Sequence, residues 1–430
     1  MSALMSFLTE SIFIPAKGAL LDFVFYYPLF MAYLWIVGAI FYYFRFEKPY
    51  TRFKTPPPLK EYPGVALVVP CHNEEDNARE TISQLLLQKY PDFEVIAIND
   101  GSRDRTGEIL DELARNEKRL RVIHQVRNQG KAVGLNMAAL MTDKEFLVCI
   151  DGDTLLDQHA VVWMMQHFVN SPRVGAVTGN PRIRNRSTLL GRVQVGEFSS
   201  IVGLIKRAQR IYGRIFTVSG VVSAFRKSAL HHVGYWSPEM LTEDIDISWK
   251  LQFSHWDIRF EPRALCWILM PETFAGLWKQ RLRWASGGVQ ALLKFLPMLF
   301  SWRRRRMWPV YAEFVLSIGW GYAIGVATIL SLLSMVLPAL MPSLLYVPPI
   351  SPGWTGVVLG MTCMFQIAVS LVLDAKYDFD LRKVYFWMVW YPLLYWMINM
   401  LTIVVAVPRI LLRNNKQNAT WDSPDRGIRE

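Results

Sequence analysis

The chain has 430 residues, of which 52% are hydrophobic and only 19% are charged, and its formal net charge is +11. An average soluble domain has about 25% charged residues, so this composition excludes a disordered chain. Four cysteines are too few for a disulfide scaffold, and no two of them have the CxxC spacing of a structural zinc site. Because the apolar residues occur in long blocks, the positive charge indicates basic flanks of membrane segments and no nucleic-acid partner.

The chain is predicted to enter a lipid bilayer near its start. Residues 23–44 contain no charged side chain, and at about 1.5 Å per residue they reach about 33 Å, which exceeds the roughly 30 Å core of a bilayer. Residues 1–21 are ambiguous because Glu10 and Lys17 interrupt a weakly apolar run. We therefore expect residues 1–60 to form an N-terminal membrane segment and a linker, which contains the turn-forming sequence TPPP.

Residues 61–275 show the pattern of an α/β domain. Segments with helical periodicity separate apolar β-branched runs, and successive runs start 25 to 29 residues apart, the length of one strand plus one helix. This alternation predicts a mostly parallel sheet covered by helices, with its ligand site at the carboxyl ends of the strands. The predicted strands are residues 65–69, 94–98, 121–124, 146–150 and 174–178.

Acidic motifs follow three of these predicted strands. They are PCHNEE at 70–75, DG at 100–101 and DGD at 151–153. The carboxyl ends of neighbouring parallel strands lie together, so these carboxylates would repel one another unless a divalent cation binds between them. An Asp-x-Asp sequence alone is common by chance. After an apolar strand and beside two other acidic turns, it predicts a site for Mg²⁺ or Mn²⁺ that leaves the ion free to bind a diphosphate.

Two more motifs carry side chains suited to a sugar nucleotide. The sequence TED at 242–244 precedes an amphipathic run, and QRLRW at 280–284 lies in a basic amphipathic helix predicted within 276–308. The Gln and the second Arg of QRLRW are three residues apart and face the same side of that helix, and the adjoining Trp offers a flat ring on which a sugar could stack. Taken alone, these motifs are typical of a helix cap and an interfacial helix.

Residues 309–407 are predicted to form the C-terminal transmembrane helices. Basic residues follow the first span and precede the second, so the α/β domain between them should be cytoplasmic. Three plain spans would put the polar tail, residues 408–430, on the opposite side, although its own basic residues favour the cytoplasm. Either the last apolar segment is broken, since it contains Pro392 and Asn399, or the charge rule fails here. The three apolar segments are residues 309–337, 354–373 and 384–407.

Together and in this order, the motifs DG, DxD, TED and QxxRW resemble those of the family 2 processive glycosyltransferases, the group of cellulose, chitin and hyaluronan synthases. The match covers about residues 60–300. Within the family, stretches such as GNPRIR, TEDIDISWKLQ and GLWKQRLRWA are similar to the catalytic subunits of bacterial poly-β-1,6-N-acetyl-D-glucosamine synthases. The resemblance implies a GT-A fold for the α/β domain, inserted between transmembrane helices.

The resemblance also implies a role for each motif residue. Pro70, Cys71, Glu74 and Asp100 would hold the uridine, with Lys131 near the nucleotide, and Asp151 and Asp153 would bind UDP through Mg²⁺ or Mn²⁺, Asp153 as the more direct ligand. Asp244 would be the catalytic base, and Gln280, Arg283 and Trp284 would hold the diphosphate and the acceptor end of the chain.

The function implied by the resemblance is polymer synthesis at the bacterial inner (plasma) membrane. The donor would be UDP-N-acetylglucosamine, and a growing β-1,6-linked polysaccharide would be exported through the bilayer for a biofilm matrix. A small membrane partner subunit and activation by cyclic di-GMP are implied as well. The chemistry agrees, since inverting transfer needs a carboxylate base and positive charge near the leaving diphosphate. The alternatives are a chitin-, hyaluronan- or cellulose-type synthase, a polyprenyl-phosphate glycosyltransferase, and a non-enzymatic nucleotide-sugar sensor.

Overall fold

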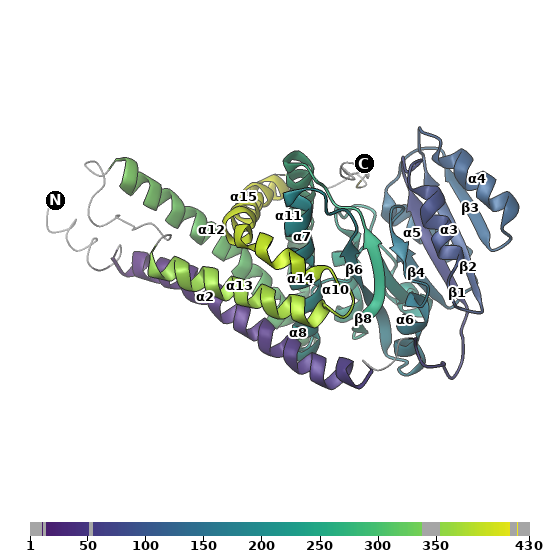
Figure 1. The fold of residues 1–430 in the computed structure, drawn as a ribbon, viewed down its shortest axis with the longest axis horizontal. Helices are drawn as coiled ribbons and strands as arrows, with labels where there is room; N and C mark the ends of the chain where they lie inside the picture. The colour runs from purple at the N-terminus through teal and green to yellow at the C-terminus, as the bar shows by residue number, and fades with distance from the viewer. Residues whose placement is uncertain (1–10, 12–13, 51–54, 338–352, 413–418, 420–430) are drawn as a thin grey trace.

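The computed structural model of the protein describes residues 11, 14–50, 55–337, 353–412 and 419. Long apolar helices extend from one end of an α/β domain (Figure 1). Within the described residues, this domain is built on one mixed sheet of eight strands in the order β3-β2-β1-β4-β7-β6-β8-β5. The strands are β1 (Val65–Cys71), β2 (Phe93–Asp100), β3 (Leu120–Gln125), β4 (Phe146–Ile150), β5 (Leu155–Leu156), β6 (Val174–Ile183), β7 (Val222–Arg226) and β8 (Asp257–Ile268).

The first half of the sheet is parallel, as the sequence predicts. β1 pairs in parallel with β2 and β4, and β2 pairs in parallel with β3, so the carboxyl ends of all four strands lie at one edge. β7 then lies antiparallel between β4 and β6, and the short β5 lies antiparallel to β8. The apolar runs of the sequence predict neither β7 nor β8. In β8, buried residues alternate with half-exposed ones over much of its length, so no apolar run marks it.

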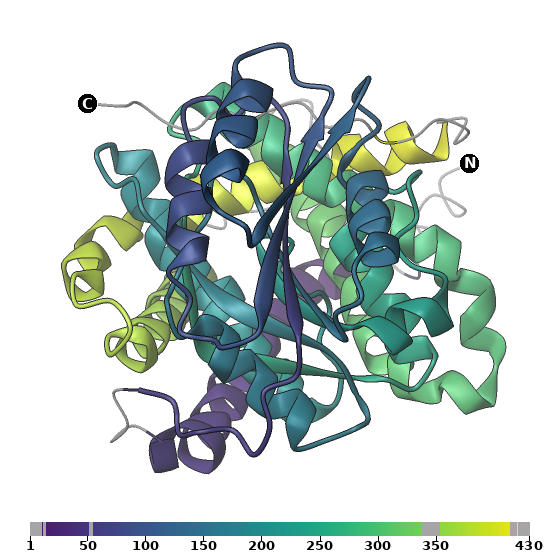
Figure 2. The ribbon, with the colours of Figure 1, turned by 90° about the vertical axis from the view of Figure 1, so that its right-hand side faces the viewer.

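Helices cover both faces of the sheet because successive strand residues point to opposite sides. Leu67 of β1 belongs to the same buried cluster as Ile82 of α3, whereas the next residue, Val68, belongs to a cluster with Leu135 of α5. Figure 2 views the molecule from the sheet end, with the long apolar helices behind the sheet. The covering helices are α3 (Ala78–Leu86), α4 (Thr106–Asn116), α5 (Lys131–Met141), α6 (Ala160–Val169), α9 (Lys227–Val233) and α10 (Glu243–Phe253).

A continuous helical segment links the sheet to the apolar helices. α7 (Leu189–Phe198) passes through a π-helical stretch (Ser199–Ile205) into α8 (Lys206–Tyr212). α8 lies so close to α2 that a β-carbon added at Gly38 would lie 2.9 Å from the Cα of Ala208. The α/β domain therefore packs directly on the first apolar helix.

Four helices in the described part of the chain are long and apolar enough to cross a membrane. α2 (Ile14–Tyr42), α12 (Trp308–Val336) and α13 (Trp354–Asp374) extend to the same side of the α/β domain (Figure 1). The fourth, α15 (Tyr391–Leu411), instead packs against α11 (Phe274–Phe295) and α12. Membrane insertion thus involves both the N-terminal and the C-terminal part of the chain.

The last apolar segment predicted from the sequence is broken. α14 (Leu381–Val384) is followed by a 3-10 helix (Tyr385–Trp390) before α15 begins. The break precedes Pro392, which lies in the first turn of α15, where a missing N–H removes no helical hydrogen bond. α15 continues beyond residue 407 to Leu411, and the amide of Ala419 donates to the carbonyl of Pro238 in the α/β domain. Most of the predicted tail lies outside the described residues.

A buried group of charged side chains joins the α/β domain to the apolar helices. This junction cluster consists of Glu47, Arg182, Arg207 and Asp374, all at most 3% exposed. Arg207 pairs with the Glu47 carboxylate, and its Nη1 lies 2.8 Å from Asp374 Oδ1. Arg182 Nη2 lies 2.9 Å from Asp374 Oδ2. Because the four residues come from β6, α8 and the ends of two apolar helices, their ion pairs fix the domain on its membrane anchor.

Candidate active site

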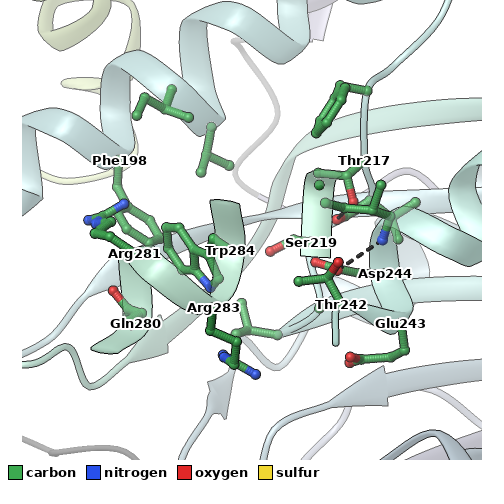
Figure 3. A pocket seen from close by; sticks show the side chains of 18 of the residues that line it. Phe198, Thr217, Ser219, Thr242, Glu243, Asp244, Gln280, Arg281, Arg283 and Trp284 are labelled. Atoms are coloured by element: carbon green, nitrogen blue, oxygen red, sulfur yellow. Dashed lines mark hydrogen bonds between the residues drawn. The ribbon is translucent and has the colours of Figure 1, made fainter. Parts of the chain in front are cut away.

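A cavity of about 470 Å³ runs from the edge of the sheet to the apolar helices. Its walls come from the turn after β4, the loop before β7, the start of α10 and the QRLRW stretch of α11, and at its far end from α2 and α12 (Figure 3). Seven of the residues singled out in the sequence line it together: Lys131, Asp151, Asp153, Asp244, Gln280, Arg283 and Trp284.

Lys131 bridges two acidic motifs that lie far apart in the sequence. Its Nζ donates to Asp151 Oδ1 at 2.6 Å and to the carbonyl of Gly220 at 2.8 Å, and it pairs with Glu243 Oε1 at 2.9 Å. Burial alone would lower the pKa of Lys131, but the two carboxylates raise it above its ordinary value. Burial would likewise raise the pKa of Glu243, but the ammonium lowers it. One lysine therefore pairs with both Asp151 and Glu243, and it favours the ionised form of Glu243.

Asp244 has a different environment from its neighbour Glu243. Its Oδ1 accepts a hydrogen bond of 2.9 Å from the Ile245 amide, and its side chain lies beside Ser219 (Figure 3). Burial, together with the negative charge of Glu243, raises the pKa of Asp244 to about 6, and Lys131 opposes this rise. A buried carboxylate with a pKa near neutral pH is suited to accept a proton from a hydroxyl group.

Trp284 and Gln280 form one wall of the cavity on α11. The Trp284 ring lies near Phe198, with ring centroids 6.4 Å apart. The Oε1 atom of Gln280 is buried and has no hydrogen-bond partner among the described residues, so a ligand hydroxyl would satisfy it. Arg283 extends from the same helix toward the side where Glu243 lies (Figure 3). This wall offers a ring for stacking, a polar acceptor and a cation.

Of the four residues expected to hold uridine, Pro70, Cys71 and Glu74 lie beside the DGD turn, and none of the four lines the cavity. A β-carbon at Gly152 would lie 3.2 Å from the carbonyl oxygen of Pro70 and 3.3 Å from Cys71 Sγ. Glu74 Oε2 accepts a hydrogen bond of 2.8 Å from the Asn77 side chain. The close approach of Pro70 and Cys71 to Gly152 explains why glycine separates the two aspartates of the motif.

Asp100 orders the loop that leads to Lys131. Its two carboxylate oxygens accept hydrogen bonds of 2.8 and 2.9 Å from the amides of Gln129 and Gly130. Gly130 has a φ of 91°, a conformation that other residues rarely adopt. Asp100 thus positions the start of α5 and, through it, the Lys131 ammonium.

The two aspartates of the DGD turn both line the cavity. Asp151 is bound to Lys131, and Asp153 is only 3% exposed. Among the described residues, no three His, Cys, Asp or Glu side chains are arranged to enclose an ion. The donor set fits Mg²⁺ or Mn²⁺ bound through Asp153, with phosphate oxygens and water completing the coordination.

We expect Asp153→Ala to abolish polymer formation and to weaken UDP binding only when Mg²⁺ or Mn²⁺ is present. The reason is that Asp153 offers a hard oxygen ligand in the cavity wall, in the motif proposed to bind the ion. Isothermal titration with UDP, with and without the cation, measures the effect. Normal polymerisation by the variant, or activity of the unmodified protein in chelator, would contradict the metal assignment.

Sequence patterns missed several cavity residues that lie on helical segments next to the membrane. Lys206 of α8 is buried, and its Nζ donates to Thr178 Oγ1 at 3.1 Å. Burial lowers the pKa of Lys206 to about 7. Arg281 of α11 also lines the cavity and pairs with Glu197 of α7, which lies behind the wall. The available signal was a charged residue inside an apolar helical run, which marks a buried functional or structural charge.

Comparisons with known proteins agree with this geometry. A family described as glycosyltransferase-like family 2 matches residues 63–287. A poly-β-1,6-N-acetyl-D-glucosamine synthase from Staphylococcus epidermidis is 40% identical over 407 residues, which cover 94% of this chain and 98% of the relative. The synthase from Staphylococcus aureus strain MSSA476 is 39% identical over 410 residues, with the same coverage of both chains.

A solved structure shares the fold. It is a mannosyltransferase from Pyrobaculum calidifontis in complex with GDP-Man and Mn²⁺, which aligns with a TM-score of 0.61 at 18% identity. The alignment covers 93% of this chain and 99% of the mannosyltransferase, so it includes the apolar helices as well as the α/β domain.

Proposed function

The chain belongs to glycosyltransferase family 2, and from that premise we propose that it polymerises N-acetylglucosamine from UDP-N-acetylglucosamine into poly-β-1,6-N-acetyl-D-glucosamine. One observation carries the proposal: a single cavity contains the acidic motifs at the sheet edge and also Tyr27, Trp35 and Glu313 of the apolar helices. An enzyme that passes its product directly into the membrane needs such a connection, whereas one that releases a soluble product does not.

In this proposal Asp244 is the general base of an inverting transfer. It removes the proton from the acceptor hydroxyl while that oxygen forms a bond to the anomeric carbon and the bond from that carbon to the diphosphate oxygen breaks. UDP leaves with the bonding electrons, and Arg283 stabilises the charge that develops on it. A Mg²⁺ or Mn²⁺ ion held by Asp153, and by Asp151 once Lys131 releases it, would supply further positive charge at the diphosphate.

The acceptor chain would occupy the part of the cavity that leads to the apolar helices. Trp284 would stack on the terminal sugar, and the aromatic rings of Phe216, Phe314 and Trp35 continue the lining beyond it. Aromatic and uncharged polar groups suit a neutral polysaccharide. The polymer would cross a bacterial inner membrane, with the α/β domain on the cytoplasmic side, and contribute to a biofilm matrix.

We also propose a small membrane partner subunit and activation of the complex by cyclic di-GMP, as the sequence resemblance implies. Large apolar side chains remain exposed on three of the apolar helices, for example Phe30 at 65%, Val326 at 47% and Val372 at 74%. These surfaces leave room for both lipid and a partner helix.

A product assay tests the proposed function. Membranes with and without the candidate partner and cyclic di-GMP would be incubated with radiolabelled UDP-N-acetylglucosamine, UDP-glucose or UDP-glucuronic acid. We expect a polymer from UDP-N-acetylglucosamine that a β-1,6-specific hexosaminidase digests and chitinase does not. Digestion by chitinase would favour the chitin-type alternative, and transfer of one sugar to polyprenyl phosphate would contradict polymerisation.

We expect Trp284→Ala to retain UDP binding but to lose elongation. The indole ring is proposed to stack on the acceptor sugar, which the donor does not require for binding. Isothermal titration with UDP beside the polymer assay separates the two effects. An equal loss of donor binding and elongation would contradict the acceptor role of Trp284.

A further inference from the structure

A buried ion pair behind the acceptor wall lies outside the residues that define the sequence motifs. Arg281 Nη2 lies 2.6 Å from Glu197 Oε2, and the two side chains are 5% and 1% exposed. Glu197 belongs to α7 and Arg281 to α11, so the pair joins two helices that are distant in the sequence. Arg281 occupies a variable position of the QxxRW pattern, which specifies only the Gln, the second Arg and the Trp.

Arg281 also contacts Trp284. The two residues are three apart on α11 and therefore neighbours on the helix surface. The guanidinium carbon of Arg281 lies 4.4 Å from the centroid of the Trp284 ring, within the range of a cation–π interaction. Figure 3 shows Arg281 and Phe198 on one side of the ring, with Ser219 and Asp244 on the other side.

Stability alone does not account for this pair. Two buried charges lose their hydration, and a buried ion pair can often be replaced by apolar side chains without loss of stability. Here the pair is also incompletely satisfied, because Glu197 Oε1 and Arg281 Nε are buried without hydrogen-bond partners in the described part of the chain. The unmet hydrogen bonds add to the cost of burying this pair.

We propose that the Glu197–Arg281 pair is a positioning device for Trp284: Glu197 fixes the guanidinium, which holds the indole ring so that its free face meets the acceptor sugar. The inference rests on the proposed acceptor role of Trp284. The guanidinium also lies 5.7 Å from the ring centroid of Tyr395 in α15, so the same device contacts an apolar helix. A movement of α15 would therefore displace Arg281 and, with it, the Trp284 ring.

A double replacement separates positioning from structural support. Arg281→Leu and Glu197→Leu, made singly, each leave one uncompensated buried charge and are expected to lower the melting temperature and to raise the KM for the acceptor. Glu197→Leu/Arg281→Leu removes both charges, so the melting temperature should return close to that of the unmodified protein. The acceptor KM should stay raised about 2- to 30-fold, the range corresponding to one cation–π contact, while the KM for the UDP-sugar stays unchanged.

Two further variants complete the comparison. Arg281→Lys keeps the positive charge but replaces the planar guanidinium by an ammonium, which stacks less well on an aromatic ring. This variant should fold normally, and its KM for the acceptor should lie between those of the unmodified protein and the double variant. Lys279→Met removes an exposed cation two residues away on the same helix and should change neither KM. Recovery of both stability and acceptor KM in the double variant would overturn the proposal, as would an equal rise of both KM values.

A spectroscopic readout keeps this test independent of the polymer. The protein would be labelled with 5-fluorotryptophan, and the ¹⁹F signal of Trp284 assigned by its absence in Trp284→Phe. The signal should shift or broaden in the double variant without any substrate, and an unchanged signal would overturn the positioning role. If the unmodified protein fails to extend β-1,6-linked N-acetylglucosamine oligosaccharides, the proposed polymer is wrong, and the ¹⁹F signal alone then decides the positioning role.

Discussion

The Asp244→Asn protein is expected to fold and bind UDP-sugar but to turn over at least about a hundredfold more slowly, the lower end of general-base contributions. Asparagine has almost the same shape and can still accept the hydrogen bond from the Ile245 amide. Only the group that accepts the proton is lost. Measuring UDP release together with the melting temperature of the purified protein tests this expectation.

The pH dependence of the rate provides a second test of Asp244. The base must be ionised to act, and burial raises its pKa to about 6. The kcat of the unmodified protein should therefore rise as the pH increases through about 6 and then level off, and the residual activity of Asp244→Asn should lack this rise.

Glu243→Gln is the matched control because it changes the adjacent carboxylate, which is bound to Lys131. Consecutive residues on a helix point about 100° apart, so only one of the two can face the acceptor. If Asp244 only supported the start of α10, its replacement would lower the melting temperature but leave the activity per folded molecule intact. Full activity in Asp244→Asn, or a loss confined to Glu243→Gln, would refute the assignment.

Arg207→Leu is expected to cause the largest loss of stability, about 3–5 kcal/mol, the usual effect of removing one partner from a buried ion pair. Arg207 is fully buried between Glu47 and Asp374, so its loss leaves two buried carboxylates that share fewer cations. Thermal unfolding of the protein in detergent or in nanodiscs measures the effect.

The comparison for Arg207→Leu is Arg79→Leu, which breaks the ion pair with Glu112 on the surface, where the side chains are 52% and 55% exposed. We expect little change in this variant because water and salt screen exposed charges. If both variants had the same melting temperature as the unmodified protein, the junction cluster would not hold the α/β domain on its anchor.

The sequence alone predicts the parallel half of the sheet and the grouping of its motifs. Strands β1, β2 and β4 are short and mainly apolar, and β3, with the sequence LRVIHQ, follows at the spacing of one strand plus one helix. Because parallel strands present their carboxyl ends at one edge, the position of Asp151 and Asp153 follows from local patterns. The membrane segments are likewise local features, since their length and lack of charge can be read directly.

The tertiary structure decides the features that depend on which distant residues meet. The antiparallel insertion of β7, the contact of Lys131 with both Asp151 and Glu243, and the contact of Arg281 with Glu197 have no local signature. The break before α15 is of the same kind, because an apolar run has the same composition whether it forms one helix or two.

The physical reason is the range of the interactions involved. Periodicity and composition indicate whether each residue is exposed to water or buried in the core, and a short window of sequence contains this information. Ion pairs, pKa values and the presented face of an aromatic ring depend on distances and burial that arise only when remote segments pack together. The sequence therefore determines which residues reach the edge of the sheet, and the packing of α7, α8 and α11 against the apolar helices determines their charge and orientation.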